Sequence, residues 1–166
     1  MTHYTVVVFD KPENVAKLLE PYNENTEVDW YKRNMVSDED INQFVKYYRV
    51  KHPDQKGLPV EELYALYGSD WHGSGAKWEF TPEGVEYWST YNPKSKWDYY
   101  TIIGTSLPDF VPFSFVTPDG EWHTKGTMGW WAMSWDEKDD QEWEKEYQAA
   151  VKKYRTRQHT IVDIHI

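Results

Sequence analysis

Four titratable residues in the second half of the chain have side chains that could transfer protons. Asp98 stands between aromatic residues in the segment NPKSKWDYY, residues 92–100. His123 lies further along, and Asp163 and His165 fall within the C-terminal segment VDIHI. A histidine held by a carboxylate can serve as a general base, so these residues are candidate catalytic groups. Their spacing selects no pair, and an isolated histidine in a sheet protein is usually structural.

Asp98 also has a structural interpretation that needs no distant partner. The pair Asn92–Pro93 predicts a turn, in which Ser95 or Asp98 can hydrogen-bond to local backbone groups. Lys96 can lie along the neighbouring rings with its amine in water. We favour this interpretation, so the segment by itself does not indicate that the protein is an enzyme.

Two of the same residues form a weak candidate metal site. His159, Asp163 and His165 share one face of a predicted C-terminal strand, because alternate strand residues point the same way. Histidine and carboxylate groups bind zinc or iron. Asp163 and His165 could share an ion, but His159 lies about 20 Å from His165 at ~3.3 Å per residue. We therefore expect no metal and no other cofactor.

Aromatic residues make up 17% of the chain, with ten tryptophans. Most of these rings are expected in the core, because aliphatic residues are scarce and large rings bury well. The segment MGWWAMSW, residues 128–135, predicts either a core strand or an apolar pocket that stacks a nucleobase. The candidate binding tryptophans are Trp97, Trp122, Trp130 and Trp131.

The chain carries 28 acidic and 18 basic residues, a formal charge of −10. Such a chain repels a phosphate backbone, so we expect no direct binding to nucleic acid. It could bind a protein with a basic surface, including one that normally holds nucleic acid. Simple solubility and the dipole-matched start of a helix also explain these acids. The candidate docking residues are Asp136, Asp139, Asp140 and Glu144.

The chain contains no cysteine, which excludes disulfides, thiolate nucleophiles and cysteine-ligated metal centres. No signal peptide is expected, because the sequence runs directly into a strand-like segment. No apolar run reaches the length of a membrane span. These features predict a cytoplasmic protein that does not associate with a membrane.

The apolar patterns predict an α+β fold in a single domain, residues 1–166. We expect an antiparallel sheet with the helices packed on one face, of the ferredoxin-like βαββαβ type with an elaborated middle. Gly68 is expected to end the third helix, and Ser134 or Asp136 to cap the last. Expected helices cover 13–19, 38–48, 60–67 and 136–157; expected strands cover 3–9, 77–80, 85–91, 97–103, 112–116, 121–123 and 159–166.

Short motifs spread over nearly the whole chain carry a resemblance: HYTVVVF, PYNEN, NPKSKWDYY, TPDGEWH, MGWW and VDIHI. In them the chain resembles a family of uncharacterised bacteriophage and prophage proteins. The family's WDWY-type segment continues into Gly-Arg-Trp, whereas Gly104 is followed here by Thr105 and Ser106. Ile164 stands where the family often has cysteine. The resemblance implies a phage origin without a mechanism, and the departures favour binding over catalysis.

Three functions remain open from the sequence. The first is a small acidic phage protein in the bacterial host cell that binds and inhibits a host defence enzyme, in the manner of an anti-CRISPR protein. The second is a protein that binds or sequesters a nucleotide-like ligand. The third is a hydrolase or metalloenzyme that uses the four titratable residues named at the outset.

Overall fold

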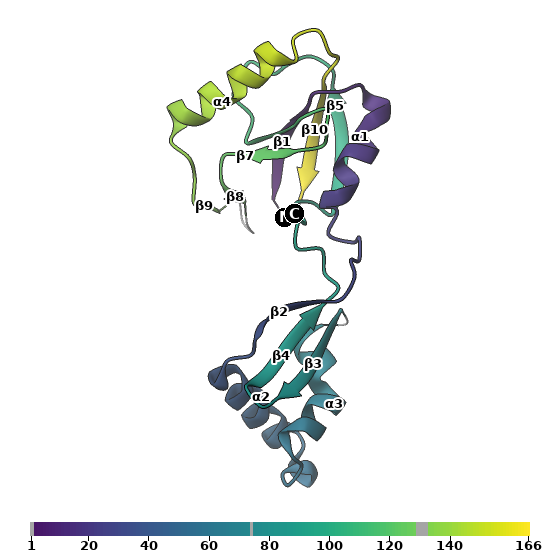
Figure 1. Cartoon of the computed structure of the whole chain (residues 1–166), viewed down its shortest axis with the longest axis vertical. Coiled ribbons are helices and arrows are strands. Elements are labelled where there is room, and N and C mark those ends of the chain that lie inside the picture. Colours follow the sequence, from purple (N-terminus) through teal and green to yellow (C-terminus); the bar gives the residue numbers. More distant parts are fainter. Residues whose placement is uncertain (1, 74, 129–132) are drawn as a thin grey trace. The chain divides into compact units, whose positions relative to one another are not determined.

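The computed structural model describes residues 2–73, 75–128 and 133–166. The chain divides into two compact units (Figure 1), whereas the sequence predicted a single domain. The flanking unit combines Met1–Thr26 with Asn92–Ile166, and the middle unit is Glu27–Tyr91. The elaborated middle that the sequence predicted is therefore a unit with a core of its own.

The flanking unit is built on a five-stranded mixed sheet with the strand order β5-β10-β1-β6-β7. The first and last strands of the chain, β1 and β10, are antiparallel neighbours, with His3 opposite His165. β1 also pairs with β6, and this pair is parallel. The strands are β1 His3–Val8, β5 Tyr99–Gly104, β6 Ser114–Val116, β7 Trp122–Thr124 and β10 Thr160–His165.

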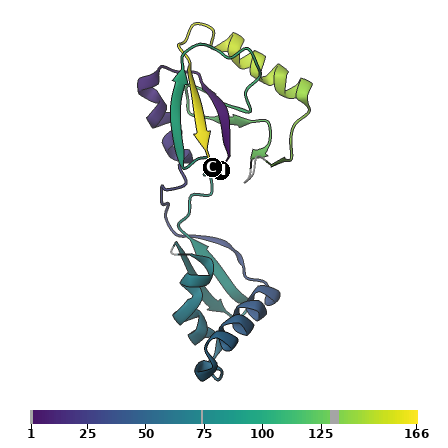
Figure 2. The same ribbon diagram turned by 180° about the vertical axis from the view of Figure 1, so that it is seen from behind.

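Helices cover both faces of this sheet. α1, Pro12–Leu19, packs on the face that carries Val6 and Val8. α4, Asp140–Lys153, packs on the opposite face, against Val7 and Phe9. Figures 1 and 2 show the two helices on opposite sides of the sheet. The short strands β8, Thr127–Met128, and β9, Ser134–Trp135, form a separate ribbon.

The α+β class predicted from the sequence is confirmed, but two details of the prediction were wrong. The larger sheet is mixed rather than antiparallel. The helices lie on both faces rather than one, so the arrangement is not ferredoxin-like. The reason lies in the end of β1 and the residue after it, since residues 6–9 are all buried. Because neighbouring residues point to opposite faces, an apolar run of this kind needs a helix on each side.

The middle unit has a three-stranded antiparallel sheet in the order β2-β4-β3. Its helices bury Phe44, Tyr48, Leu63 and Tyr64 in one cluster. The elements are β2 Tyr31–Met35, α2 Asp38–Lys51, α3 Val60–His72, β3 Ala76–Thr81 and β4 Gly84–Ser89, with 3-10 turns at Glu20–Tyr22 in the flanking unit and Pro53–Gln55 in this one.

Each predicted helix differs from the structure at one boundary or both, and two of the differences concern residues expected to end or cap a helix. α3 continues past Gly68 to His72 and is capped by Gly73, whose φ of 95° suits glycine. Gly68 instead lies inside the helix, at the position where the ring of Trp78 packs against its backbone. The cap of α4 is Asp139, whose side chain accepts hydrogen bonds from two backbone N–H groups, and not Ser134 or Asp136.

Among the described residues, no helix is both long enough and apolar enough to cross a membrane.

Candidate functional site

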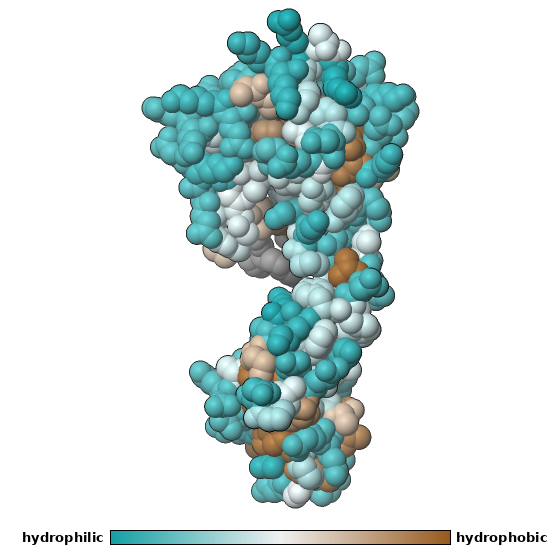
Figure 3. Space-filling model, viewed as in Figure 1, coloured by the Kyte–Doolittle hydropathy of each residue, from teal (hydrophilic) through white to brown (hydrophobic). Residues whose placement is uncertain are grey.

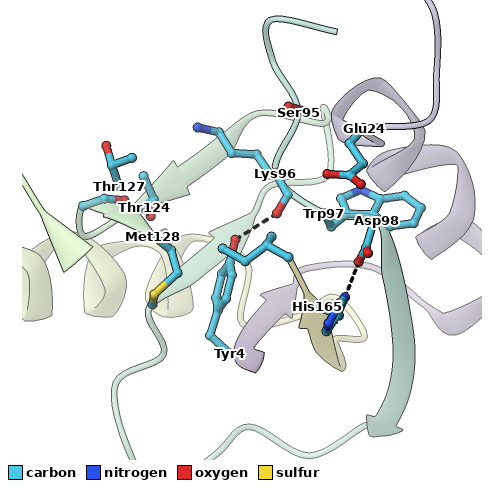
Figure 4. A pocket seen from close by; sticks show the side chains of 12 residues that line it. Tyr4, Glu24, Ser95, Lys96, Trp97, Asp98, Thr124, Thr127, Met128 and His165 are labelled. Atoms are coloured by element: carbon cyan, nitrogen blue, oxygen red, sulfur yellow. Dashed lines mark hydrogen bonds and ion pairs between the residues drawn. The ribbon is translucent and has the colours of Figure 1, made fainter. Parts of the chain in front are cut away.

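A cavity of about 360 Å³ opens in the flanking unit where β10 ends and β5 begins. Figure 4 shows side chains from the chain's N-terminal strand, its C-terminal strand and the segment before β5 around this space. The start of β1 and the end of β10 lie side by side at this cavity. Just beyond the two strands, Thr2 and Ile166 exchange backbone hydrogen bonds. The lining residues are Tyr4, Glu24, Ser95, Lys96, Trp97, Asp98, Thr124, Gly126, Thr127, Met128, His165 and Ile166.

Asp98 and His165 form a hydrogen-bonded pair in this pocket. The Asp98 N–H donates to the His165 carbonyl over 3.1 Å, which extends the β5–β10 pairing by one residue. Asp98 Oδ1 lies 2.5 Å from His165 Nδ1 (Figure 4). The side chains are 29% and 18% exposed, respectively. The strand register therefore brings together two residues that are far apart in the sequence.

This contact determines the protonation pattern of the neutral histidine ring. An ionised carboxylate only accepts hydrogen bonds, so Nδ1 carries the proton and Nε2 keeps a free lone pair. His165 Nε2 is buried and has no hydrogen-bond partner among the described residues. A buried acceptor without a donor costs about 1–3 kcal/mol. A ligand could donate to this nitrogen only if the lining shifted to expose it, because the atom is buried in this structure.

A second carboxylate–histidine pair lies beside the first. His3 Nδ1 is 2.9 Å from Asp163 Oδ2, and the rings of His3 and His165 are 5.0 Å apart. Asp163 and His165, the two weak metal candidates, thus contact different partners. No group of three or more ligating side chains in the described part of the chain could hold a metal ion.

The walls of the pocket are fixed by hydrogen bonds to backbone carbonyls. The Trp97 indole N–H donates to the Leu19 carbonyl over 2.9 Å, and this side chain is almost fully buried. The Tyr4 hydroxyl donates to the Lys96 carbonyl over 3.2 Å. Burial raises the pKa of Tyr4 well above its usual value, so this hydroxyl stays neutral. The pocket is therefore shaped before any ligand arrives.

The structural role expected of Asp98 belongs to Asn92. The Asn92 amide donates to the carbonyls of Pro21 and Asn23, and its oxygen accepts from the Lys94 N–H. These bonds hold the turn without help from a carboxylate. The interpretation of Asp98 as bonded only to local backbone was wrong, because its side chain contacts His165.

His123, His159 and His72 have neighbours other than Asp98. His123 Nδ1 is 3.0 Å from Glu146 Oε1 on α4, and its ring stacks on Phe115 at 4.6 Å. His159 lines a different depression. His72 belongs to the middle unit, where it packs against aromatic rings. Of the four candidate catalytic residues, the structure joins Asp98 to His165, pairs Asp163 with His3 and leaves His123 in a separate network.

The predicted binding tryptophans are mostly structural where they are described. Trp97 forms a wall of the pocket and is anchored in the core. Trp122 packs on Tyr22, with ring centroids 5.0 Å apart. Trp130 and Trp131 lie outside the described residues.

Two of the four candidate acidic residues have partners inside the flanking unit. Asp139 caps α4, and Asp140 lies 2.6 Å from Lys125 Nζ. Hydrogen bonds from Lys125 to Asp140 and Glu137 raise the pKa of Lys125 to about 12. Asp136 and Glu144 are exposed. Asp139 and Asp140 therefore already have structural partners at the start of α4.

Sequence reasoning did not single out Tyr4, Glu24 and Thr127 as pocket residues. One signal could have found much of the site: five of the six segments that carry the family resemblance meet in this pocket. They are HYTVVVF through Tyr4, PYNEN through Glu24, NPKSKWDYY through residues 95–98, MGWW through Met128, and VDIHI through His165 and Ile166.

Comparison of the chain with protein-family models, with curated proteins and with solved structures found no match. The resemblance to bacteriophage and prophage proteins therefore stays a prediction from the sequence motifs.

Proposed function

We propose that the protein binds a small polar ligand in the pocket beside β10 and that His165, held by Asp98, exchanges a proton with it. One observation carries this proposal: a histidine whose Nδ1 contacts a carboxylate lines the cavity, while its buried Nε2 has no hydrogen-bond partner among the described residues. In that state the ring can accept a proton from a ligand hydroxyl or amine.

The chemistry of the pocket favours a polar ligand over a stacked nucleobase. Glu24, Lys96 and Thr127 bring charged and hydroxyl groups to the lining. Lys96 has no carboxylate partner in the described part of the chain, so its amine remains available to an anionic group. The Trp97 indole, in contrast, is packed into the core and offers no free face for stacking.

The expected proton position can be tested without knowing the ligand. Long-range ¹⁵N NMR of the imidazole rings distinguishes a protonated from an unprotonated ring nitrogen. For His165 we expect a protonated Nδ1 and an unprotonated Nε2. Asp98→Asn should disturb this pattern, because an amide can donate as well as accept. Asp163→Asn is the matched control, since it breaks the His3 contact and leaves the Asp98 contact in place.

Ligand binding then tests the function itself. Thermal shift measurements across sugars, amino acids, phosphate esters and nucleotides should identify a stabilising compound. His165→Asn keeps an amide N–H near the position of Nδ1 and removes Nε2, so it should weaken binding of that compound about tenfold or more. A protonated Nε2 in the free protein, or a bound compound that is indifferent to His165→Asn, would refute the proposal.

Inhibition of a host defence enzyme through the acidic surface of α4 ranks below this proposal. Its candidate residues Asp139 and Asp140 already cap the helix or pair with Lys125. It keeps the support of the overall negative charge and of the phage resemblance.

A further inference from the structure

An aromatic groove lies on the outside of α2 and α3 in the middle unit. It encloses about 560 Å³, and Tyr47, Val50 and Trp71 supply its apolar part. Val50 is 73% exposed, Tyr47 48% and Trp71 37%. Large exposed side chains that touch one another mark interaction sites more often than scattered ones do. Figure 3 shows hydrophobic residues among polar ones on the visible face of this unit.

The exposed rings of the groove are fixed in place because they pack on buried rings of the core. The ring of Trp71 packs 5.8 Å from that of the fully buried Phe44 and 6.0 Å from that of Tyr48. Tyr47 in turn contacts both Tyr48 and Trp71. A partner that binds such preformed rings loses little free energy in ordering them.

The rim of the groove is positively charged, unlike the protein as a whole. Lys46 and Lys51 line it together with Gln43, and no lining residue is acidic. Neither lysine pairs with a carboxylate in the described part of the chain, and the amine of Lys51 lies 5.5 Å from the ring centre of Tyr47. Asp70 is a carboxylate close to these rings. Burial raises the pKa of the Tyr48 hydroxyl, the negative charge of Asp70 raises this pKa further, and the positive charge of Lys51 lowers it.

We propose that this groove binds an acidic amphipathic helix of a partner protein. Apolar side chains of the helix would fill the space between Tyr47, Val50 and Trp71, and its carboxylates would pair with Lys46 and Lys51. Helices commonly dock in grooves through residues spaced three and four apart. This inference concerns the middle unit and does not depend on the pocket in the flanking unit.

Charge favours this occupant over two others. Residues 27–91 contain 12 acidic and 7 basic residues, so the unit as a whole repels nucleic acid. In a twofold dimer through the groove, the lysines of one copy would face those of the other. An acidic helix meets neither difficulty.

A displayed library of amphipathic helices tests the proposal on the full-length protein. Sixteen-residue peptides would carry leucine or phenylalanine at positions i, i+3, i+4 and i+7, with glutamate, lysine, glutamine or serine elsewhere. We expect the selected peptides to be rich in glutamate. Fluorescence anisotropy with the most enriched peptide then gives its affinity.

Three variants make the experiment specific. Val50→Glu and the double change Lys46→Glu with Lys51→Glu should each weaken binding about tenfold or more. Lys56→Glu changes the charge of the same unit outside the groove and should change the affinity less than about twofold. All these side chains are exposed, and circular dichroism would verify folding.

Several results would overturn the proposal. These are the absence of any enriched peptide, enrichment without a bias toward glutamate, and equal binding by Val50→Glu. Displacement of the peptide by single-stranded DNA, or a dimer in sedimentation that Val50→Glu dissociates, would assign the groove to another occupant.

Discussion

At the scale of single residues, the environment of each histidine determines what it can do. His3, His123 and His165 each contact a carboxylate within the described residues, whereas His72 packs against the rings of Trp78 and Tyr87. Of these three histidines, His165 is the one that lines the cavity of about 360 Å³, and its buried Nε2 has no hydrogen-bond partner among the described residues. The residue type alone therefore does not identify the site.

His72 should make the middle unit sensitive to acid. Burial lowers the pKa of His72 below its ordinary value of 6.5, and the nearby Asp40 opposes this only in part. Between the lowered pKa and 6.5 the unfolded chain binds more protons, so stability falls as the pH drops through that range. We expect the free energy of unfolding to decrease more between pH 7.5 and 5.5 for the wild type than for His72→Gln. Urea denaturation at both pH values measures this, and equal decreases would contradict the explanation.

At the scale of elements, close packing rather than helix propensity explains Gly68 in α3. A Cβ at this position would lie 2.6 Å from a ring carbon of Trp78 on β3. The helix and the strand can approach this closely only because glycine lacks that atom. A residue that the sequence suggested as a helix end is thus a contact point between two elements.

Gly68→Ala should destabilise the middle unit although alanine favours helices. The propensity gain of about 1 kcal/mol is expected to be outweighed by overpacking against Trp78, which typically costs ~1–3 kcal/mol. Thermal denaturation should show a lower midpoint for this variant. Gly57→Ala is the control, because no atom lies within 4 Å of the added methyl. A stabilised Gly68→Ala protein would show that Trp78 moves aside easily.

At the scale of the whole molecule, the middle unit is inserted into a flanking unit whose two segments are tied together where the insertion begins. The Glu24 N–H donates to the Trp97 carbonyl, and the Lys96 N–H donates to the Tyr22 carbonyl. Asn92 reaches back to the Asn23 carbonyl over 3.1 Å. The chain therefore leaves and re-enters the flanking unit at neighbouring points.

Replacing residues 27–91 by a short glycine-serine linker should leave the flanking unit folded. Its sheet, both of its helices and its pocket use only residues of that unit. We expect a cooperative thermal transition and dispersed NMR signals, including the His165 signals of the full-length protein. Loss of cooperative folding would show that the flanking unit depends on the insertion.

Local patterns determined much of the secondary structure. Ser37 caps α2 through a hydrogen bond from the Asp40 N–H to its hydroxyl. The segment TPDG forms the turn between β6 and β7, and Trp143, Tyr147 and Ala150 form the buried stripe of α4. Capping groups, turn residues and apolar spacing act over a few neighbours, so the sequence contains them directly.

The pairing of Asp98 with His165 was decided only by the tertiary structure. The sequence indicated both residues as candidate catalytic groups, but it indicated His123 and Asp163 equally and selected no pair among the four. Which of them meet depends on β10 lying between β1 and β5 in one register, because a shift by one residue turns every side chain to the other face. The sequence by itself determined the reactive groups and most elements, while long-range strand pairing decided which groups share a pocket.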